Sequence, residues 1–214
     1  MHSSPALFAW LVVTFLVGGI PFGFVVVKLL LGKDVRSVGS GNIGATNASR
    51  CFPGKSRWVA FAGIYVLDFL KGFLPVFWLA PRVANALDMH WAAPLFALVA
   101  VLGHCFSPYL GFKGGKGVAT AGGAFFALEP MAVLVAIGVF FVVALSTRVV
   151  ALGSIALGFA LALAVVLRQP ATAFGPRLYT TTLAILLAFF LVWTHRSNLR
   201  KLLEAGRNRD EAVS

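Results

Sequence analysis

Charged residues are scarce in this sequence. Only 12% of its 214 residues are Asp, Glu, Lys or Arg, whereas a soluble domain carries about 25%. Hydrophobic residues make up 59% of the chain, and no soluble fold of this length buries that much apolar surface. The shortage of charge therefore excludes a soluble globular protein and indicates that the lipid bilayer surrounds most of the chain.

Cysteine is nearly absent as well, with Cys51 and Cys105 as the two thiols. Two cysteines give no disulfide framework, and the sequence has no residues with the spacing of a metal site. We therefore expect no disulfide, no metal and no other cofactor. The N-terminus lacks a basic segment before its first apolar run, and that run is too long for a cleaved signal peptide.

Acidic residues are the scarcer charged group: 7 Asp and Glu stand against 18 Lys and Arg, which gives a net charge of +11. Such an excess suits nucleic acid, anionic lipid or an anionic substrate. The basic residues fall in short loops between apolar runs, so we expect no nucleic-acid binding. Most of the excess follows from the Lys/Arg enrichment of inner loops in membrane proteins, which leaves a few residues for a substrate.

The sequence is rich in long apolar runs. A run of about 20 residues crosses the roughly 30 Å hydrocarbon core as a helix, so the sequence predicts an all-α polytopic membrane protein, one domain over residues 1–214, with about seven transmembrane helices. The fourth run is too short to cross alone unless its ends are buried in protein, and a re-entrant hairpin with the fifth run would leave five or six spans. The predicted spans are 6–31, 57–80, 92–110, 117–128, 130–147, 149–168 and 178–195.

The placement of Lys and Arg predicts the orientation of these spans. With the N-terminus outside, 14 of the 18 basic residues fall on the inner side, three on the outer side, and Lys71 inside a span. Inner loops are the basic ones, so we expect an outer N-terminus and a cytoplasmic C-terminus. The three outer residues are Arg82, Arg168 and Arg177.

The first polar segment is VGSGNIGATNASR at residues 38–50. Glycine lets backbone N–H groups approach an anion, and the arginine guanidinium suits phosphate. A connecting loop with ordinary turn residues is the alternative, but the density of small polar side chains favours a binding site. The candidate residues are Ser40, Asn42, Thr46, Asn47 and Arg50.

The second segment, GHCFSPYLGFKGGKGVAT at residues 103–120, fails the test for a nucleotide-binding P-loop. Leu110 stands where the first glycine belongs, and Gly117 stands where Ser or Thr is needed. What remains is a glycine-rich turn with Lys113 and Lys116 before a short helix, an arrangement that favours an anion. The alternative is that both lysines only anchor the chain at the membrane surface.

Histidines mark two further positions. His104 ends the third span and is either a substrate-binding group or a buried structural one. In the third segment, at residues 193–206, His195 and Asn198 are three apart and share a helical face. The alternative there is an amphipathic basic helix on anionic lipid. Asp68 and Lys71 form an i,i+3 pair inside the second span, for which we expect a supporting role.

Taken in order and spacing, these segments resemble the bacterial acyl-phosphate:glycerol-3-phosphate acyltransferase family, PlsY. The resemblance implies a seven-span enzyme of the bacterial cell inner membrane, with its active site at the cytoplasmic face. Two departures stand out: Ser107-Pro108 shifts the family's proline by one place, and Ser197 replaces a carboxylate. The matching pieces are GGIPFG at 18–23, DVRSVGSGNIGATNASR at 34–50, LDFLKG at 67–72, GFKGGKGVAT at 111–120 and HRSNLRKLL at 195–203.

The resemblance also implies the reaction and its participants. The enzyme would move an acyl group from acyl phosphate to glycerol 3-phosphate, at the membrane lipid surface and as a monomer. His195 or a substrate phosphate would take the proton. The implied catalytic residues are Ser40, Arg50 and Lys116, which bind phosphate, and His195 and Asn198, which orient glycerol 3-phosphate. The implied supporting and substrate-binding residues are Asn42, Thr46, Asn47, Lys113 and His104.

Three other functional classes compete with this interpretation. The acyltransferases that pair a histidine with an aspartate five positions on are excluded, because Tyr109 and Arg200 occupy those positions. An anion transporter is the rival from another class, and it would need charges near mid-membrane on broken paired helices. A structural lipid-binding protein is the third alternative.

Overall fold

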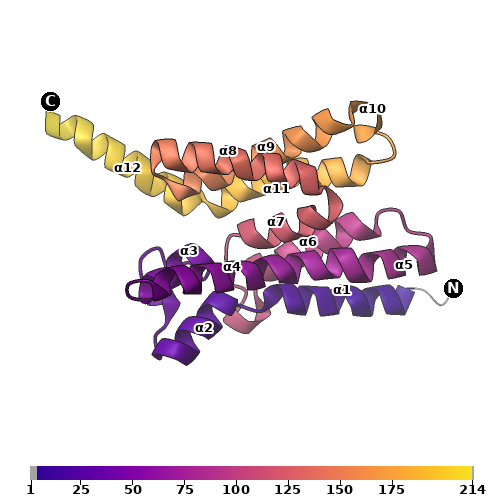
Figure 1. Cartoon of the computed structure of the whole chain (residues 1–214), viewed down its shortest axis with the longest axis horizontal. Helices are drawn as coiled ribbons and strands as arrows, with labels where there is room; N and C mark the ends of the chain where they lie inside the picture. Colours follow the sequence, from indigo (N-terminus) through magenta and orange to yellow (C-terminus); the bar gives the residue numbers. More distant parts are fainter. Residues whose placement is uncertain (1–3, 214) are drawn as a thin grey trace. The chain divides into compact units, whose positions relative to one another are not determined.

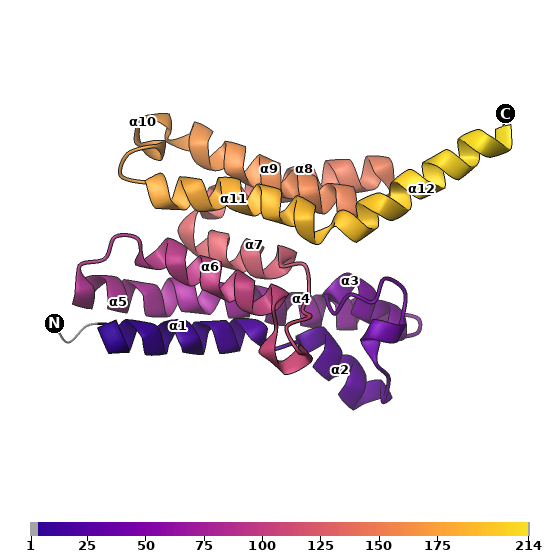
Figure 2. The same cartoon turned by 180° about the vertical axis from the view of Figure 1, so that it is seen from behind.

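The computed structural model describes residues 4–213, apart from the side chains of residues 4, 206 and 209–213. Over that range the chain is helical and has no strand, which confirms the predicted all-α class. Its contacts divide it into two compact units, one ending at Pro130 and one beginning at Met131 (Figures 1 and 2).

The first unit is a bundle of four helices, α1 (Ser4–Gly19), α4 (Ser56–Leu74), α6 (Ala92–Cys105) and α7 (Val118–Leu128). These helices run side by side in both views (Figures 1 and 2). One end of the bundle carries α2 (Phe22–Leu31) and α3 (Ala45–Ala48), and the other carries α5 (Ala80–Leu87). Three short 3₁₀ turns complete the unit, at Val35–Ser37, Ser49–Cys51 and Pro108–Leu110.

Glycine allows the helix backbones of this bundle to touch. A Cβ at Gly72 of α4 would overlap the Thr120 carbonyl of α7, and one at Gly123 of α7 would overlap the Phe69 carbonyl of α4. In the same way, Gly18 of α1 lies against the backbone of Ala100 in α6. Small residues at such crossings are the usual means of helix association in membranes.

The second unit contains three long helices, α8 (Pro130–Thr147), α9 (Val150–Arg168) and α11 (Leu178–Thr194), with a short α10 (Pro170–Ala173) between the last two. Gly158 of α9 packs against Ala188 and Leu191 of α11. After α11 the chain bends by 51° into the basic helix α12 (Arg196–Val213).

Six apolar segments in the described part of the chain have the length of a membrane span. Four are unbroken, and two are helix pairs bent by 44° and 51°. The predicted fourth span is the shorter helix α7, whose residues 120–125 are buried. The unbroken spans are Ser56–Leu87, Ala92–Leu110, Pro130–Thr147 and Val150–Arg168, and the bent pairs are Pro5–Gly19 with Phe22–Leu31 and Leu178–Thr194 with Arg196–Ala205.

Two span boundaries differ from the sequence prediction. The predicted span 57–80 continues to Leu87, because a π-helical turn at Pro75–Leu79 joins α4 to α5. The predicted span 6–31 is broken after Gly19, because Pro21 has no N–H to continue the helix.

The break leaves two backbone carbonyls, those of Gly19 at the end of α1 and of the following Ile20, outside the helical hydrogen-bond pattern, and two side chains distant in the sequence donate to them. Ser107 Oγ donates to the Gly19 carbonyl at 2.6 Å, and Lys71 Nζ donates to the Ile20 carbonyl at 2.6 Å. Buried carbonyls need partners where water is absent. The bend is therefore stabilised by contacts from α4 and from the turn after α6.

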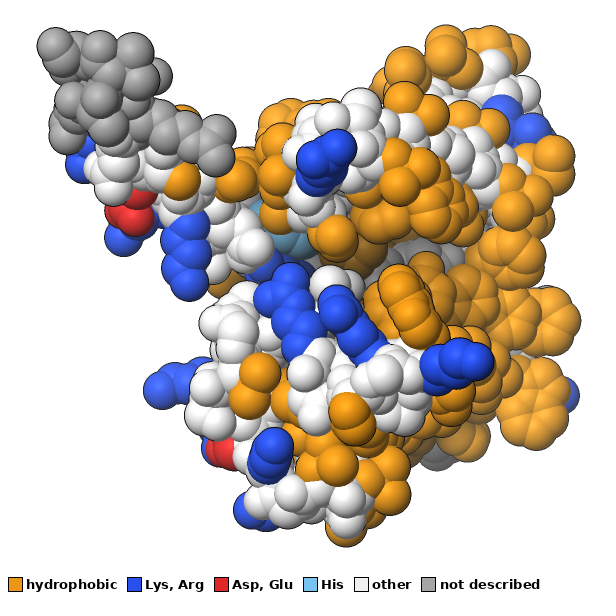
Figure 3. Space-filling model, turned by 60° about the vertical axis from the view of Figure 1, so that its left-hand side comes forward, with side chains coloured by type: hydrophobic (Ala, Val, Ile, Leu, Met, Phe, Trp, Pro, Cys, Tyr) orange, Lys and Arg blue, Asp and Glu red, His pale blue; other side chains and the backbone are white. Residues whose placement is uncertain are grey.

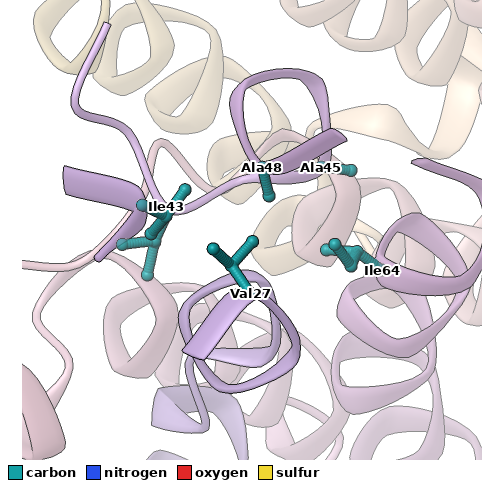
Figure 4. Close-up of a cluster of buried hydrophobic side chains, with 6 residues drawn as sticks. Val27, Ile43, Ala45, Ala48 and Ile64 are labelled. Atoms are coloured by element: carbon teal, nitrogen blue, oxygen red, sulfur yellow. The ribbon is translucent and has the colours of Figure 1, made fainter. Parts of the chain in front are cut away.

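A small hydrophobic core fixes the polar segment that follows α2. Val27 of α2, Ile43 of the loop, Ala45 and Ala48 of α3, and Ile64 of α4 point toward one another (Figure 4). With Val35 they are at most 7% exposed. Apolar side chains spaced through a polar loop thus anchor it to the bundle.

Candidate active site

The first loop begins with a carboxylate that organises its own turn. The Asp34 carboxylate accepts from the Arg36 backbone N–H at 2.9 Å and from the Arg36 guanidinium at 2.7–3.1 Å. The Arg36 side-chain hydrogen bonds, followed by its backbone N–H, lower the pKa of Asp34 to about 2. Arg36 is therefore engaged with Asp34.

Asn47 holds the loop in shape from within. Its Oδ1 accepts from the Ser40 N–H at 3.0 Å, and its Nδ2 lies 2.8–3.2 Å from three backbone carbonyls, those of Val35, Val38 and Asn42. The side chain is 2% exposed. The Asn47 side chain therefore supports the shape of the loop, and any contact that it makes with substrate stays a prediction.

Ser40 and Arg50 come together around Gly39. Gly39 has a φ of +56°, and a Cβ there would lie 2.5 Å from Asn47 Oδ1 and 3.1 Å from an Arg50 guanidinium nitrogen. Only glycine suits both that backbone conformation and that approach. The guanidinium thus lies against the backbone beside Ser40, and both side chains are exposed.

The other candidates of the first loop are also at its surface. Thr46 is exposed and Asn42 is half-buried. Figure 3 faces the end of the first unit that carries α2 and α3, where Lys and Arg side chains gather among polar atoms and border hydrophobic ones. Such a surface suits a molecule with an anionic head and an apolar tail.

The second loop lies directly on the end of α6. The Gly114 and Gly115 N–H groups donate to the Cys105 and His104 carbonyls, each at 3.0 Å. A Cβ at either glycine would overlap His104. The Gly-Gly pair therefore allows the backbone of the second loop to lie directly against the end of α6.

This arrangement presents the two lysines at the loop surface. Lys113 is exposed and Lys116 is half-buried, just before Gly117 and the first turn of α7. Gly117 adopts a φ of +82°, which turns the chain into that helix. Positive charge is therefore placed beside the N-terminus of a helix, where an anion is favoured.

The two loops adjoin within the first unit. Leu110 of the second loop packs against the core cluster that holds the first loop. Gly23 of α2 touches the Ile43 carbonyl of the first loop, and Gly19 touches Pro108. Five candidates of the first loop and two lysines of the second thus share one end of the bundle.

His104 does not reach that surface. Its side chain is 4% exposed and its Nδ1 lies 3.7 Å from Asp68 Oδ1. The ring Nε2 abuts Gly115 from below. Of the two roles left open by the sequence, this placement favours the structural one over the predicted substrate contact, because the loop covers the ring.

His195 and Asn198 belong to the second unit. His195 caps α11, with Nδ1 at 2.8 Å from the Leu191 carbonyl, and it is 3% exposed. A carbonyl only accepts, so Nδ1 carries the proton and Nε2 is the nitrogen of the neutral ring that accepts or takes up a proton. The Asn198 N–H donates to the His195 carbonyl at 2.9 Å, which fixes the spacing of the pair.

The sequence missed the contribution of Ser107. It stood out only as a departure from the family pattern, yet it is fully buried and bonded to Gly19. The available signal in the sequence was Pro21. A proline at this place predicts a helix break, and a break leaves backbone carbonyls that need hydrogen-bond donors from elsewhere in the chain.

A bundle of apolar helices with two basic, glycine-rich loops at one end defines a polytopic membrane protein with a cationic loop surface. The sequence matches the family described as glycerol-3-phosphate acyltransferase over residues 8–205. The chain belongs to this family, and it is an acyltransferase enzyme. The membership supports the enzyme over the transporter alternative.

Relatives and solved structures agree with the family. The chain is 41% identical to the glycerol-3-phosphate acyltransferase of Geobacter sulfurreducens, over 94% of this chain and 95% of the relative. It is 38% identical to that of Clostridium acetobutylicum, over 89% and 93%. The crystal structure of PlsY, an integral membrane glycerol 3-phosphate acyltransferase, in its glycerol 3-phosphate form matches with a TM-score of 0.79 at 34% identity, over 94% of this chain and 93% of that one. The lysophosphatidic acid form matches with a TM-score of 0.78.

Proposed function

We propose that this enzyme transfers a fatty acyl group from acyl phosphate to the 1-hydroxyl of glycerol 3-phosphate. The products are lysophosphatidic acid and inorganic phosphate, and the enzyme works as a monomer in the bacterial cytoplasmic membrane with both loops at the inner face. Support comes from the relatives' names and from the two forms in which PlsY was solved. In this chain, the observation that carries the proposal is that the Arg50 guanidinium lies against Gly39, next to Ser40, in a loop whose core cluster also contacts Leu110 of the lysine-bearing second loop.

Both substrates present a phosphate, so the site must hold anions. Arg50 offers a planar fork to phosphate oxygens, and Ser40 adds a hydroxyl beside it. Lys116 supplies a second cation at the start of α7. The predicted roles of Asn42, Thr46, Asn47 and Lys113 are to support these loops, and His195 and Asn198 orient the acceptor.

The chemistry needs little beyond placement and charge. The acceptor oxygen forms a bond to the acyl carbon, and the bond from that carbon to the phosphate oxygen breaks. The phosphate leaves with its electron pair, which fixed cations stabilise, and holding both substrates together lowers the barrier further.

The hydroxyl proton passes to a phosphate oxygen of the donor, while His195 orients the hydroxyl. Support for this choice is that the loops are rich in phosphate binders and poor in bases. We expect His195→Gln to retain near-normal turnover at saturating substrates, with raised Michaelis constants. A loss of turnover of about a hundredfold or more would instead make His195 the base.

Phosphate release by the purified protein tests the proposal. Release should require both acyl phosphate and glycerol 3-phosphate, and Lys116→Ala should lower kcat/KM by about a hundredfold. Lys55→Ala is the matched control, because Lys55 is an exposed cation outside both loops, and it should act like the wild type. Release without glycerol 3-phosphate, or full activity of Lys116→Ala, would contradict the proposal.

A further inference from the structure

Three ionisable side chains are buried together in the first unit, close to the ends of α1 and α6. Lys71 Nζ lies 2.8 Å from Asp68 Oδ1 within α4, and His104 Nδ1 of α6 lies 3.7 Å from the same oxygen. All three side chains are 2–4% exposed. None of them reaches the surface where the proposed function places its substrates.

One branch of this cluster leads to the first loop. Lys71 donates to the Ile20 carbonyl at the helix break, and its Nζ lies 5.5 Å from the centroid of the Phe22 ring, where α2 begins. One residue further on, Gly23 touches the Ile43 carbonyl of the first loop. Lys71 therefore contacts both sides of the break that precedes α2, and α2 in turn touches the loop of Ser40 and Arg50 through Gly23.

The other branch leads to the second loop. The His104 ring abuts Gly115, and the His104 carbonyl accepts the Gly115 N–H at 3.0 Å. Lys116 is the next residue along the chain. A shift or rotation of His104 would therefore move the backbone that carries Lys116.

The cost of burying charge argues that Asp68 and Lys71 do more than neutralise each other. A buried ion pair in a membrane helix is no more stabilising than apolar side chains of similar size. Here Asp68 pairs with Lys71 and has a second polar neighbour in His104, whose Nδ1 lies 3.7 Å away, and each of these two residues contacts a different loop or the helix that carries it. An apolar residue in place of Asp68 could not interact with both Lys71 and His104.

We propose that Asp68 is a positioning residue that holds the two phosphate-binding loops in register, through Lys71 on one side and His104 on the other. The inference rests on the proposed function, in which the two loops bind the phosphates of the two substrates. Each loop keeps its own hydrogen bonds without Asp68, so binding persists. What is lost is the alignment of donor and acceptor, for which an error of about 1 Å costs on the order of a hundredfold in rate.

The test replaces the charges in two ways and measures phosphate release. Asp68→Asn keeps the volume of the side chain, and the double variant Asp68→Leu/Lys71→Met removes both charges, so no uncompensated ion is left to unfold the protein. We expect kcat to fall at least tenfold in each, with both Michaelis constants within about threefold of the wild type. Asp88→Asn, an exposed carboxylate at the other end of the bundle, is the control.

A purely structural pair would behave otherwise. The unfolding temperature would then change, while kcat below that temperature would stay at the wild-type value, and this result would overturn the proposal. A rise in the Michaelis constants alone would also overturn it, because it would place Asp68 in binding rather than alignment.

A double-mutant cycle separates this proposal from the function on which it rests. If Asp68 acts on the register of the Lys116 loop, Asp68→Asn combined with Lys116→Ala should lose little more than Lys116→Ala alone. Multiplication of the two losses would show independent action and overturn the proposal. If Lys116→Ala is inactive and Asp68→Asn is fully active, the positioning role of Asp68 is contradicted and the proposed function is not. If Lys116→Ala is fully active, the proposed function itself is contradicted.

Discussion

Several buried polar side chains of the first unit serve backbone groups of their own chain. Asn47 contacts four backbone atoms, and Ser107 and Lys71 each take a carbonyl at the end of α1. In a membrane protein no water stands ready to replace such a donor. Single substitutions at these residues should therefore lower the free energy of unfolding.

The Ser107 hydroxyl gives the simplest case. Ser107→Ala removes the donor to the Gly19 carbonyl and leaves that buried oxygen unsatisfied, which costs about 1–3 kcal/mol. The unfolding temperature in detergent, followed by tryptophan fluorescence, should fall by several degrees. Ser146→Ala is the control, since its exposed hydroxyl bonds only within α8, and a drop as large as that of Ser107→Ala would contradict this account.

The Asp34–Arg36 pair makes a prediction about pH. The folded pKa of Asp34 is about 2, below the ordinary value of 3.8, so its stabilising effect is complete above the ordinary value and is lost as pH falls through about 2. Asp34 is therefore ionised throughout any usable assay range. The pH–rate profile of Asp34→Asn should keep the wild-type apparent pKa values between pH 5 and 9, and a displaced limb would show that Asp34 titrates there.

At this scale, the sequence indicates where a residue lies when its contacts are within its own loop. Asn47 and Arg50 lie in the loop whose composition announced them, and the structure brings both beside Ser40. It could not place His104, because the ring's environment depends on how α4 packs against α6 and on a loop that folds back over it. The roles of the individual candidates in catalysis stay predictions.

Among the helices, the crossing of α4 and α7 depends on the absence of side chains at two points. Gly123→Ala would drive a Cβ into the Phe69 carbonyl, and overpacking of this kind costs about 1–3 kcal/mol. Gly122→Ala is a neighbouring control, because a Cβ there meets nothing within 4 Å, and alanine favours a helix. Thermal unfolding should separate the two variants, and equal stability would mean that the helices do not touch as described.

The helix boundaries show what hydropathy misses. Apolar runs located the long apolar helices but not the basic helix α12. They are also insensitive to a bend, so 6–31 was predicted as one span although Pro21 divides it. Likewise the π-helical turn at Pro75–Leu79 carries the next span to Leu87, beyond the apolar run that predicted its end at 80. Both differences arise from backbone hydrogen bonding rather than from composition.

For the whole molecule, the count of basic residues predicts an orientation that accessibility can test. In a variant without Cys51, a cysteine at Asp88 between α5 and α6 should react with a membrane-impermeant maleimide from outside. A cysteine at Lys55 should react only after the membrane is opened. The reverse pattern would place the loops, and with them the proposed site, on the outer face.

The three polar segments of the sequence are distributed over the two units. Those at 38–50 and 103–120 lie in the first unit, while His195 and Asn198 lie in the second. The sequence grouped all three at one membrane face by counting spans. The positions of Lys and Arg are enough to predict that grouping. They do not predict the contacts by which two of the segments adjoin, such as that of Leu110 with the Val27 cluster, because these depend on packing.

The break between α1 and α2 also has a consequence in time. The donors to Gly19 and Ile20 lie 88 and 51 residues further along the chain. At roughly 5–20 residues per second of synthesis, Ser107 emerges on the order of ten seconds after the carbonyl it will bind. Until Lys71 emerges the end of the first helix has neither of these partners, and until Ser107 emerges the Gly19 carbonyl still lacks its donor. The insertion of this protein must therefore pass through a stage in which water or the insertion machinery solvates a gap that the finished chain later closes.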